Sequence, residues 1–307
     1  LVREALKRQA EFSGLRQEHH MAVASMLQDR ENVANRRGRH LFLAEEYEAS
    51  LSVLLEGAKQ CYSESRNELG WELILMREKA LDELNVPQTD LRWSEGWLIK
   101  ERFFGQKKRF AAVLDIAELI LKKTENTAGA EPIRAMAWFR KGNIQRLMSK
   151  PAVARESLKT AMAIAPEDPE VKWRALEAMG SLELMYGDPK LSEEYFVGAL
   201  EAAQAIEQPD HVFAVRQNMA GVYRRNGDTE KARWHLSAAL EYYQSTGSKR
   251  AQSRCLNDLA ELDRFTGNLE KAEEGYRQAL SLLEALGAQD FYVSALNLGA
   301  IYTETGR

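Results

Sequence analysis

The stretch Asn218-Met-Ala-Gly-Val-Tyr-Arg-Arg-Asn-Gly227-Asp recurs twice in altered form further along the chain. The later copies are Asp258-Leu-Ala-Glu-Leu-Asp-Arg-Phe-Thr-Gly267-Asn and Asn297-Leu-Gly-Ala-Ile-Tyr-Thr-Glu-Thr-Gly306-Arg. Each copy contains a glycine near its end, and with Gly187 these glycines stand 40, 40 and 39 residues apart. A repeat of about 40 residues indicates a solenoid, which works through the surface it displays.

Apolar residues on either side of these glycines recur at three- and four-residue steps, the period of an amphipathic helix. The stripe Ala232, Leu236, Ala239, Leu240 and Tyr243 returns one repeat later, from Ala272 to Leu283, and no β pattern is seen. All seven prolines fall at expected helix starts or between helices, where their missing N–H does no harm. We expect an all-α chain with helices at 131–148, 151–164, 169–186, 189–206, 210–225, 229–244, 249–265, 269–286 and 290–305.

The gross composition excludes several classes of protein. The 307 residues are 45% hydrophobic and 29% charged, which is typical of a chain that buries a core. The longest apolar stretch, 111–121, contains two acids and is too short to cross a bilayer, so we expect no membrane association. The net charge of -4 argues against nucleic acid as a partner, and we interpret the basic clusters 36–39 and 107–109 as solvated turns. Cys61 and Cys255 lack metal-ligand spacing, and an intracellular, cytoplasmic setting fits best.

No catalytic signature stands out. A phosphate-binding loop, a nucleophile elbow and a His-Glu-x-x-His pair are all absent from the sequence. His19 and His20 point in different directions if helical, and no third ligand is spaced to join them in a metal site. We therefore expect no enzyme activity, no cofactor and no metal in this segment. The six tryptophans are expected to fill gaps between repeats.

One segment resembles the tetratricopeptide repeat family. Trp138-Phe-Arg-Lys-Gly142-Asn, followed by Ala154, Leu158, Ala161 and Pro166, has the family's residues in order. Later repeats keep the small positions Gly180, Ala220, Ala260 and Gly299 in the first helix and Ala199, Ala239 and Ala279 in the second. The resemblance implies a right-handed superhelical solenoid of antiparallel helix pairs. The long period is similar to that of kinesin light chains, bacterial quorum-sensing regulators and signal-transducing ATPase regulators.

The chain departs from the family pattern at one position of the first helix. An aromatic residue is kept there as Tyr223 and Tyr302, but Glu183 and Asp263 replace it in the other repeats. We expect these two replacements to weaken single repeats.

The resemblance divides the chain into three regions. Residues 131–307 form a regular array whose last repeat is incomplete, residues 91–130 a divergent repeat, and residues 1–90 an irregular helical region or cap. The chain begins without methionine and stops just after Gly306, from which we expect a piece of a longer protein.

The family resemblance also implies a concave binding face lined by first helices. The positions carried over to that face in this sequence are Arg140, Asn143, Gln217, Asn218, Arg224, Arg225, Arg254, Asn257, Arg264 and Asn297, together with acids such as Glu177, Asp258 and Glu261. Asn218 and Asn297 resemble backbone-clamping asparagines, because an amide both donates and accepts. Arginines can fork onto a carboxylate of the ligand. The alternative is an ordinary exposed helix face, on which the arginines only suit the helix dipole.

Two functions remain open. The chain is expected to be a protein–protein interaction scaffold that binds a peptide or helical segment, with acidic or carboxylate groups on the ligand. The alternative is the sensor or regulatory arm of a larger signalling protein, such as a signal-transducing ATPase, a kinase or a transcription regulator. Packing of the solenoid against itself as a homo-oligomer is a third alternative.

Overall fold

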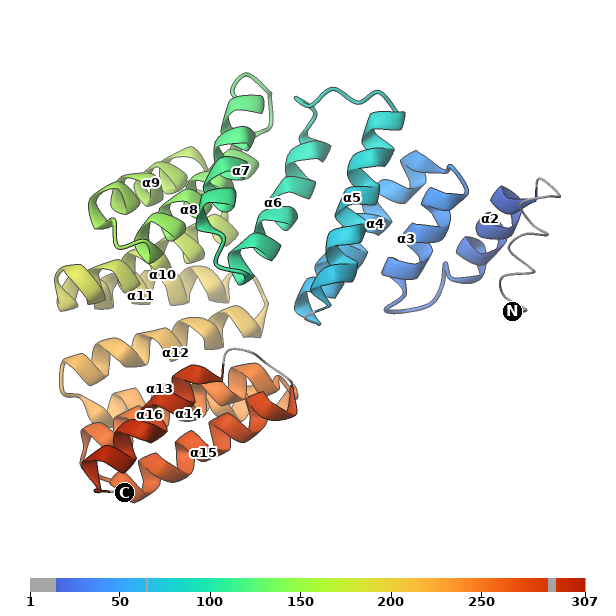
Figure 1. Ribbon diagram of the computed structural model, residues 1–307. Helices are drawn as coiled ribbons and strands as arrows, with labels where there is room; N and C mark the ends of the chain where they lie inside the picture. Colours follow the sequence, from blue (N-terminus) through green and yellow to red (C-terminus); the bar gives the residue numbers. More distant parts are fainter. Residues whose placement is uncertain (1–14, 65, 287–290, 307) are drawn as a thin grey trace. The chain divides into compact units, whose positions relative to one another are not determined.

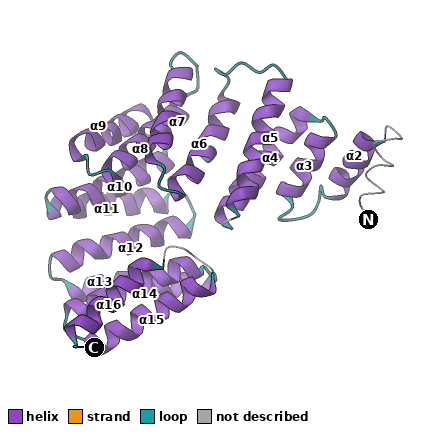
Figure 2. Ribbon diagram, viewed as in Figure 1, coloured by secondary structure: helices purple, strands orange, loops and turns teal. Residues whose placement is uncertain are grey.

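The computed structural model describes residues 15–64, 66–286 and 291–306 (Figure 1). The chain divides into two compact units, 1–148 and 149–307. Within the described ranges the structure consists of helices joined by turns, and no strand is found there (Figure 2). The expectation of an all-α chain is confirmed.

The first unit is built from helices that pack on their neighbours in the chain. They are α2 (Arg16–Met26), α3 (Ala34–Leu43), α4 (Tyr47–Ser63), α5 (Asn67–Glu83), α6 (Leu91–Gln106), α7 (Phe110–Lys123) and α8 (Glu131–Leu147). One apolar cluster gathers Leu54, Leu73, Ile74 and Phe103, and a second gathers Leu51, Leu81, Trp93, Trp97 and Ile120. At Gly57 an added Cβ would lie 2.7 Å from the Asn35 backbone, so α3 and α4 approach closely only because this residue is glycine.

The basic cluster at residues 36–39 does not form the solvated turn that its composition suggested. These residues lie inside α3, where they point from different sides of one helix. The cluster at 107–109 does lie in the turn between α6 and α7.

The second unit repeats one helix-turn-helix pattern. It contains α9 (Pro151–Ile164), α10 (Pro169–Tyr186), α11 (Pro189–Gln204), α12 (Pro209–Arg225), α13 (Thr229–Ser245), α14 (Lys249–Phe265), α15 (Leu269–Ala285) and α16 (Tyr292–Glu304). The expected helices are all present from 131 onward, with ends within two residues of those predicted. The predicted start of the last helix, at 290, lies outside the described residues.

The turn glycines are of two kinds. Gly227, Gly267 and Gly306 end α12, α14 and α16 with φ of +79°, +81° and +71°, the left-handed region that favours glycine. Gly187 follows α10 with φ −139°, and here the reason for glycine is space. An added Cβ would lie 1.8 Å from Oε2 of Glu183.

The small residues of the repeats allow the close packing expected of them, with one exception. Three alanines of the second helices, Ala199, Ala239 and Ala279, are completely buried. Ala220 and Ala260 of the first helices are almost completely buried. At Gly180 a Cβ would lie 2.8 Å from the buried ring of Phe196. Gly299 is different, because it is exposed and nothing lies within 4 Å of an added Cβ.

The acidic replacements of the family aromatic are paired inside the second unit. Glu183 of α10 is 4% exposed and accepts hydrogen bonds of 2.9 and 2.7 Å from Arg155 of α9. One double repeat later, Asp263 of α14 accepts a bond of 2.6 Å from Arg233 of α13. The expected weakening therefore has a compensation, because each buried carboxylate meets a cation from the preceding second helix.

The intervening repeats use a different pair at the same two positions. Glu193 of α11 stands where Arg155 stands in α9, and it hydrogen-bonds to Tyr223. Burial and this carboxylate raise the pKa of Tyr223 to about 12. In the last repeat Arg277 joins Glu273, at 2.6 Å, to the Tyr302 hydroxyl, at 3.0 Å. Arginine–acid and glutamate–tyrosine contacts thus alternate, with a period of two repeats.

Most tryptophans pack between helices as expected, but Trp234 does not. Trp93, Trp97 and Trp173 are buried, whereas Trp234 of α13 is 57% exposed. The Arg216 guanidinium lies 4.8 Å from its ring centre, and His235 makes an edge contact with it.

Candidate functional site

The first helices of the second unit are joined side by side by amide hydrogen bonds. Nδ2 of Asn218 in α12 donates to Oε1 of Glu177 in α10 at 2.8 Å. Nδ2 of Asn297 in α16 donates to Oδ1 of Asn257 in α14 at 3.1 Å. Between these contacts, Nε2 of Gln217 donates to Oδ2 of Asp258 at 2.7 Å. We call this set the amide ladder: Glu177, Gln217, Asn218, Asn257, Asp258 and Asn297.

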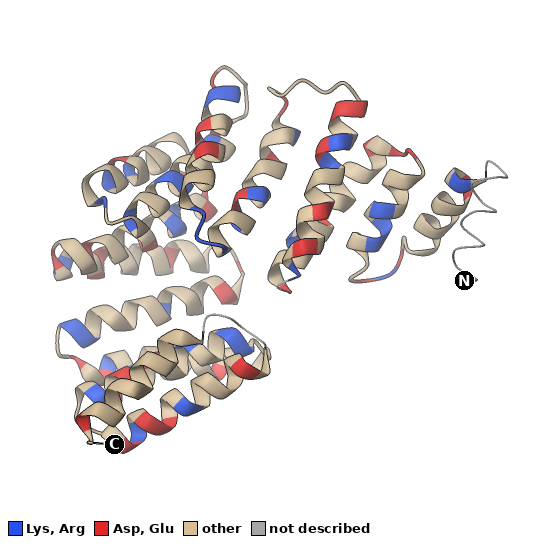
Figure 3. Cartoon of the chain, viewed as in Figure 1, with Lys and Arg blue, Asp and Glu red and all other residues tan. Residues whose placement is uncertain are grey.

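A second row of contacts joins the same helices through charges. Arg224 of α12 lies 3.2 Å from Glu261 of α14, and Nε of Arg264 lies 2.9 Å from Oε1 of Glu304 in α16. Arg264 also lies 3.8 Å from Glu261, so the four side chains form one continuous ion-pair ladder. Figure 3 shows acidic and basic residues interspersed over these helices.

A hollow of about 170 Å³ opens between the two ladders. Along α12 its lining runs from Asn218 through Gly221 to Arg224, at three-residue steps on one helix face. Gly221 lies between the other two residues, and a Cβ added to it would stand 3.3 Å from the Leu184 side chain. Gln217 of α12 and Asp258 and Leu262 of α14 also line the hollow. The lining therefore combines amide, carboxyl, guanidinium and apolar groups.

Among the residues that line this hollow, Asp258 is the acidic one. Desolvation by burial raises the pKa of its carboxyl group above the ordinary value. Hydrogen bonds from Gln217 and Asn257 oppose that rise, and so do the charges of Arg254 and Arg224. Burial thus favours the neutral form of Asp258, and its neighbours favour the ionised form.

The structure separates the residues predicted for the binding face. Gln217, Asn218, Asn257 and Asn297 lie in the amide ladder, and Arg224 and Arg264 lie in the ion-pair ladder, all in the second unit. Arg225 and Arg254 are exposed there and make no ion pair within the described residues. Arg140 and Asn143 belong to the first unit.

The two predicted residues of the first unit have partners within it. Nε of Arg140 lies 2.9 Å from Oε1 of Glu101, a residue that is almost fully buried. Oδ1 of Asn143 accepts from Arg146 at 2.8 Å. Arg140 thus balances a buried charge between α8 and α6.

Sequence reasoning placed Glu177, Asp258 and Glu261 on this face but missed two other partners of the predicted residues. These partners are Glu304 and Ser294. Glu304 accepts from Arg264 at 2.9 Å, and Ser294 donates to Oδ1 of Asn257 at 3.3 Å. The signal was available in the repeat itself, because Asn218 follows Glu177 by 41 residues and Glu304 follows Arg264 by 40. A polar residue one period away from another is a candidate contact between neighbouring first helices.

Over the described ranges no group of three or more His, Cys, Asp and Glu residues is placed to hold a metal ion. Nδ1 of His20 lies 2.9 Å from Nδ1 of His40, and burial together with Arg36 and Arg39 lowers the pKa of His40. Both cysteines are buried free thiols. Among the described helices, none has the length and apolar character needed to span a membrane.

One segment of the second unit matches a known protein family. Residues 213–285, from α12 to the end of α15, match the family model described as tetratricopeptide repeat. No curated protein sequence matches the chain.

Solved structures extend the likeness beyond that segment. A signal-transduction ATPase with a tetratricopeptide repeat sensor, from Pyrococcus horikoshii, superposes with a TM-score of 0.67 at 13% identity, covering 94% of this chain and 43% of that one. A Rap protein in complex with Competence and Sporulation Factor gives 0.64 at 16% identity, covering 84% and 72%. BtubC from P. vanneervenii gives 0.53 at 17% identity, covering 65% and 84%. At these identities the shared property is the fold. Residues 213–285 thus match the tetratricopeptide repeat family, and the described structure shares the fold of such proteins beyond them.

Proposed function

We propose that the second unit is a protein-binding scaffold that holds a peptide or helical segment along α10, α12, α14 and α16. The observation that carries this proposal is the hollow between the two ladders, which Asn218 and Arg224 of α12 line together with Asp258 of α14. A ligand seated there meets an amide, a guanidinium and a carboxyl group on two neighbouring first helices.

The amide ladder supports the proposal because it fixes its side chains before a ligand arrives. Asn218 is exposed, and its bond to Glu177 uses one of its two N–H groups. The other N–H and the carbonyl oxygen can pair with a backbone N–H and C=O of the ligand. A side chain already held in one orientation loses little entropy on binding, which favours affinity.

The charges suggest which arginines read a carboxylate on the ligand. Arg224 and Arg264 already hold Glu261 and Glu304, so a ligand must compete for them. Arg225 and Arg254 are exposed and have no such partner within the described residues. We assign recognition of acidic ligand groups to Arg225 and Arg254.

The alternative function, the sensor arm of a larger regulator, is favoured by the kind of proteins that share the fold. One is described as carrying a tetratricopeptide repeat sensor, and another is solved with a signalling factor bound. Both functions begin with ligand binding to the repeats. They differ in whether binding changes the chain, which hydrogen exchange with and without ligand measures in the helices outside the contact.

The experiment selects peptides from a displayed random library on the intact chain and measures their affinity for variants. Asn218→Ala and Asn297→Ala should weaken a selected peptide about tenfold each, about 1.4 kcal/mol, because a clamping amide is lost. The matched control is Asn226→Ala, which removes an exposed asparagine from the turn after α12. Affinity unchanged in both ladder variants would exclude this face as the binding site.

A further inference from the structure

The first unit contains a cavity of about 650 Å³ that the proposed scaffold function does not use. It is bounded by the turn after α2, the start of α3 and one face of α4, with Arg77 of α5 and Arg92 and Glu95 of α6 at its side. Its apolar lining includes Leu27, Val33 and Leu55. Cavities of roughly 300–1,000 Å³ with apolar walls and a few polar groups are typical ligand sites.

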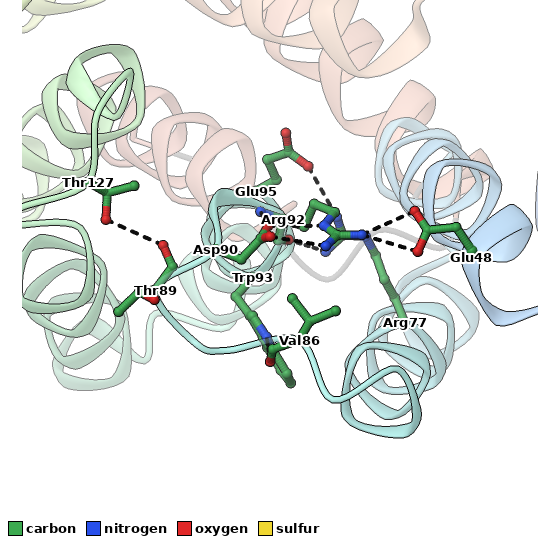
Figure 4. Close-up of polar contacts among 9 residues, drawn as sticks. All are labelled: Glu48, Arg77, Val86, Thr89, Asp90, Arg92, Trp93, Glu95 and Thr127. Atoms are coloured by element: carbon green, nitrogen blue, oxygen red, sulfur yellow. Dashed lines mark hydrogen bonds and ion pairs between the residues drawn. The ribbon is translucent and has the colours of Figure 1, made fainter.

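Charges around Arg77 and Arg92 are balanced by neighbouring acids (Figure 4). Arg77 is almost fully buried, and it donates to the Leu51 carbonyl at 3.1 Å and to Glu95 at 3.1 Å. Arg92 donates to Glu48 at 3.1 and 3.2 Å and pairs with Asp90 at 3.0 Å. Glu48 and Glu95, two of the three carboxylates that line the cavity, are therefore already engaged.

The remaining cations of the cavity have no such balance. Arg30, Arg37 and Lys59 line it and make no ion pair within the described residues, and Glu56 is the one further lining carboxylate. Nε of Arg37 is shielded from solvent and has no acceptor among the described groups. A shielded donor without an acceptor is costly, so this atom marks where an acceptor is missing.

We propose that this cavity binds an acidic peptide segment, with a ligand carboxylate on Arg37 and Lys59 and an apolar side chain against Leu27, Val33 and Leu55. A guanidinium offers a carboxylate two parallel N–H donors, which suits Arg37. The volume favours a peptide over a lone inorganic anion, because a single phosphate leaves the apolar wall uncovered. The site is independent of the amide ladder, since every lining residue belongs to the first unit.

The test uses the intact chain and a fluorescein-labelled hexapeptide of alternating glutamate and leucine, with binding followed by anisotropy. We expect Arg37→Gln combined with Lys59→Gln to weaken binding at least tenfold. The matched control, Arg36→Gln combined with Arg39→Gln, removes the same charge from exposed positions of α3 that do not line the cavity. It should change affinity less than twofold, and so should Asn226→Ala, in the turn after α12 of the second unit.

Three results would overturn the proposal: no binding of the peptide to the wild-type chain at millimolar concentration, equal loss in the cavity and control variants, or unchanged affinity when alanine replaces leucine in the peptide. The last result, together with competition by inorganic phosphate, would assign the cavity to a simple anion. Circular dichroism checks that Arg37→Gln folds. If it does not, Arg30→Gln combined with Lys59→Gln, both at exposed positions, replaces it with the same expected loss.

Discussion

Gln217 of α12 donates a 2.7 Å hydrogen bond to Asp258 of α14, one repeat further on. Burial raises the pKa of the Asp258 carboxyl, and Gln217 is foremost among the groups that oppose the rise. The contact therefore joins two repeats and also opposes protonation of the Asp258 carboxyl group at the wall of the hollow.

Gln217→Ala should loosen this junction. The carboxylate of Asp258 loses a donor, and an unsatisfied buried acceptor costs about 1–3 kcal/mol of unfolding free energy. The neighbouring change Asn218→Ala, at an exposed site, should cost less than about 1 kcal/mol. Hydrogen exchange in α12 and α14 measures both variants, and equal protection in the two would contradict the role given to Gln217.

Replacing the arginine–acid pair Arg155–Glu183 by a glutamate–tyrosine pair should preserve the contact between these two helices, whereas changing Arg155 alone should break it. Arg155→Leu leaves the Glu183 carboxylate without its cation; removing one partner of a buried pair costs about 3–5 kcal/mol, and less here because Arg155 is partly exposed. Arg155→Glu combined with Glu183→Tyr recreates the Glu193–Tyr223 contact of the next repeat. Urea unfolding should show recovery in the double variant, whereas Arg155→Glu alone, with two facing carboxylates, should be the least stable.

Acid should destabilise the second unit through His235. Burial and the charges of Arg216 and Lys231 lower its pKa from 6.5 to about 4. Because the folded state disfavours the charged ring, its contribution is fully present above pH 6.5 and is lost as the pH falls toward 4. The loss is on the order of 3 kcal/mol at most.

Urea unfolding at pH 7 and pH 4.5 measures this dependence. The variant His235→Gln should lose less stability than the wild-type chain over this interval. His19→Gln, at an exposed position of α2, serves as the matched substitution and should behave as wild type. A wild-type profile for His235→Gln would show that another group carries the acid sensitivity.

Cys255 should be inert toward alkylation while the second unit is folded. The residue is completely buried, and burial together with Asp258 raises the pKa of its thiol to about 12. In a Cys61→Ser background, iodoacetamide at pH 8 should label Cys255 only through transient opening. Labelling should quicken in Gln217→Ala, and rapid labelling of the otherwise wild-type fold would contradict the buried position.

The sequence predicts the helices well because local signals mark both of their ends. Pro151, Pro169, Pro189 and Pro209 begin helices, since a first-turn residue needs no N–H, and Gly227 and Gly267 end them in a left-handed conformation. These signals act within one turn of chain. Pairings across repeats act over about 40 residues, and local reasoning does not reach them.

The candidate site shows the same division. Residue type and position identified Asn218 and Asn297 as polar residues on first helices, but their partners Glu177 and Asn257 follow from how neighbouring helices are aligned. The sequence predicts that Glu183 weakens its repeat, because the residue type alone does not indicate that Arg155 lies against it. Trp234 was expected to pack, yet the helix leaves most of its ring exposed.

The alternation of arginine–acid and glutamate–tyrosine contacts sets a rule for shortening or lengthening the second unit. Removing α12 and α13 would bring Glu193 of α11 against Asp263 of α14, two carboxylates where the fold requires complementary groups. Removing the four helices from α10 to α13 would instead place Arg155 of α9 against Asp263, a pair of the native kind. In engineering or in gene duplication, the segment that can be gained or lost without mismatch is therefore two repeats long.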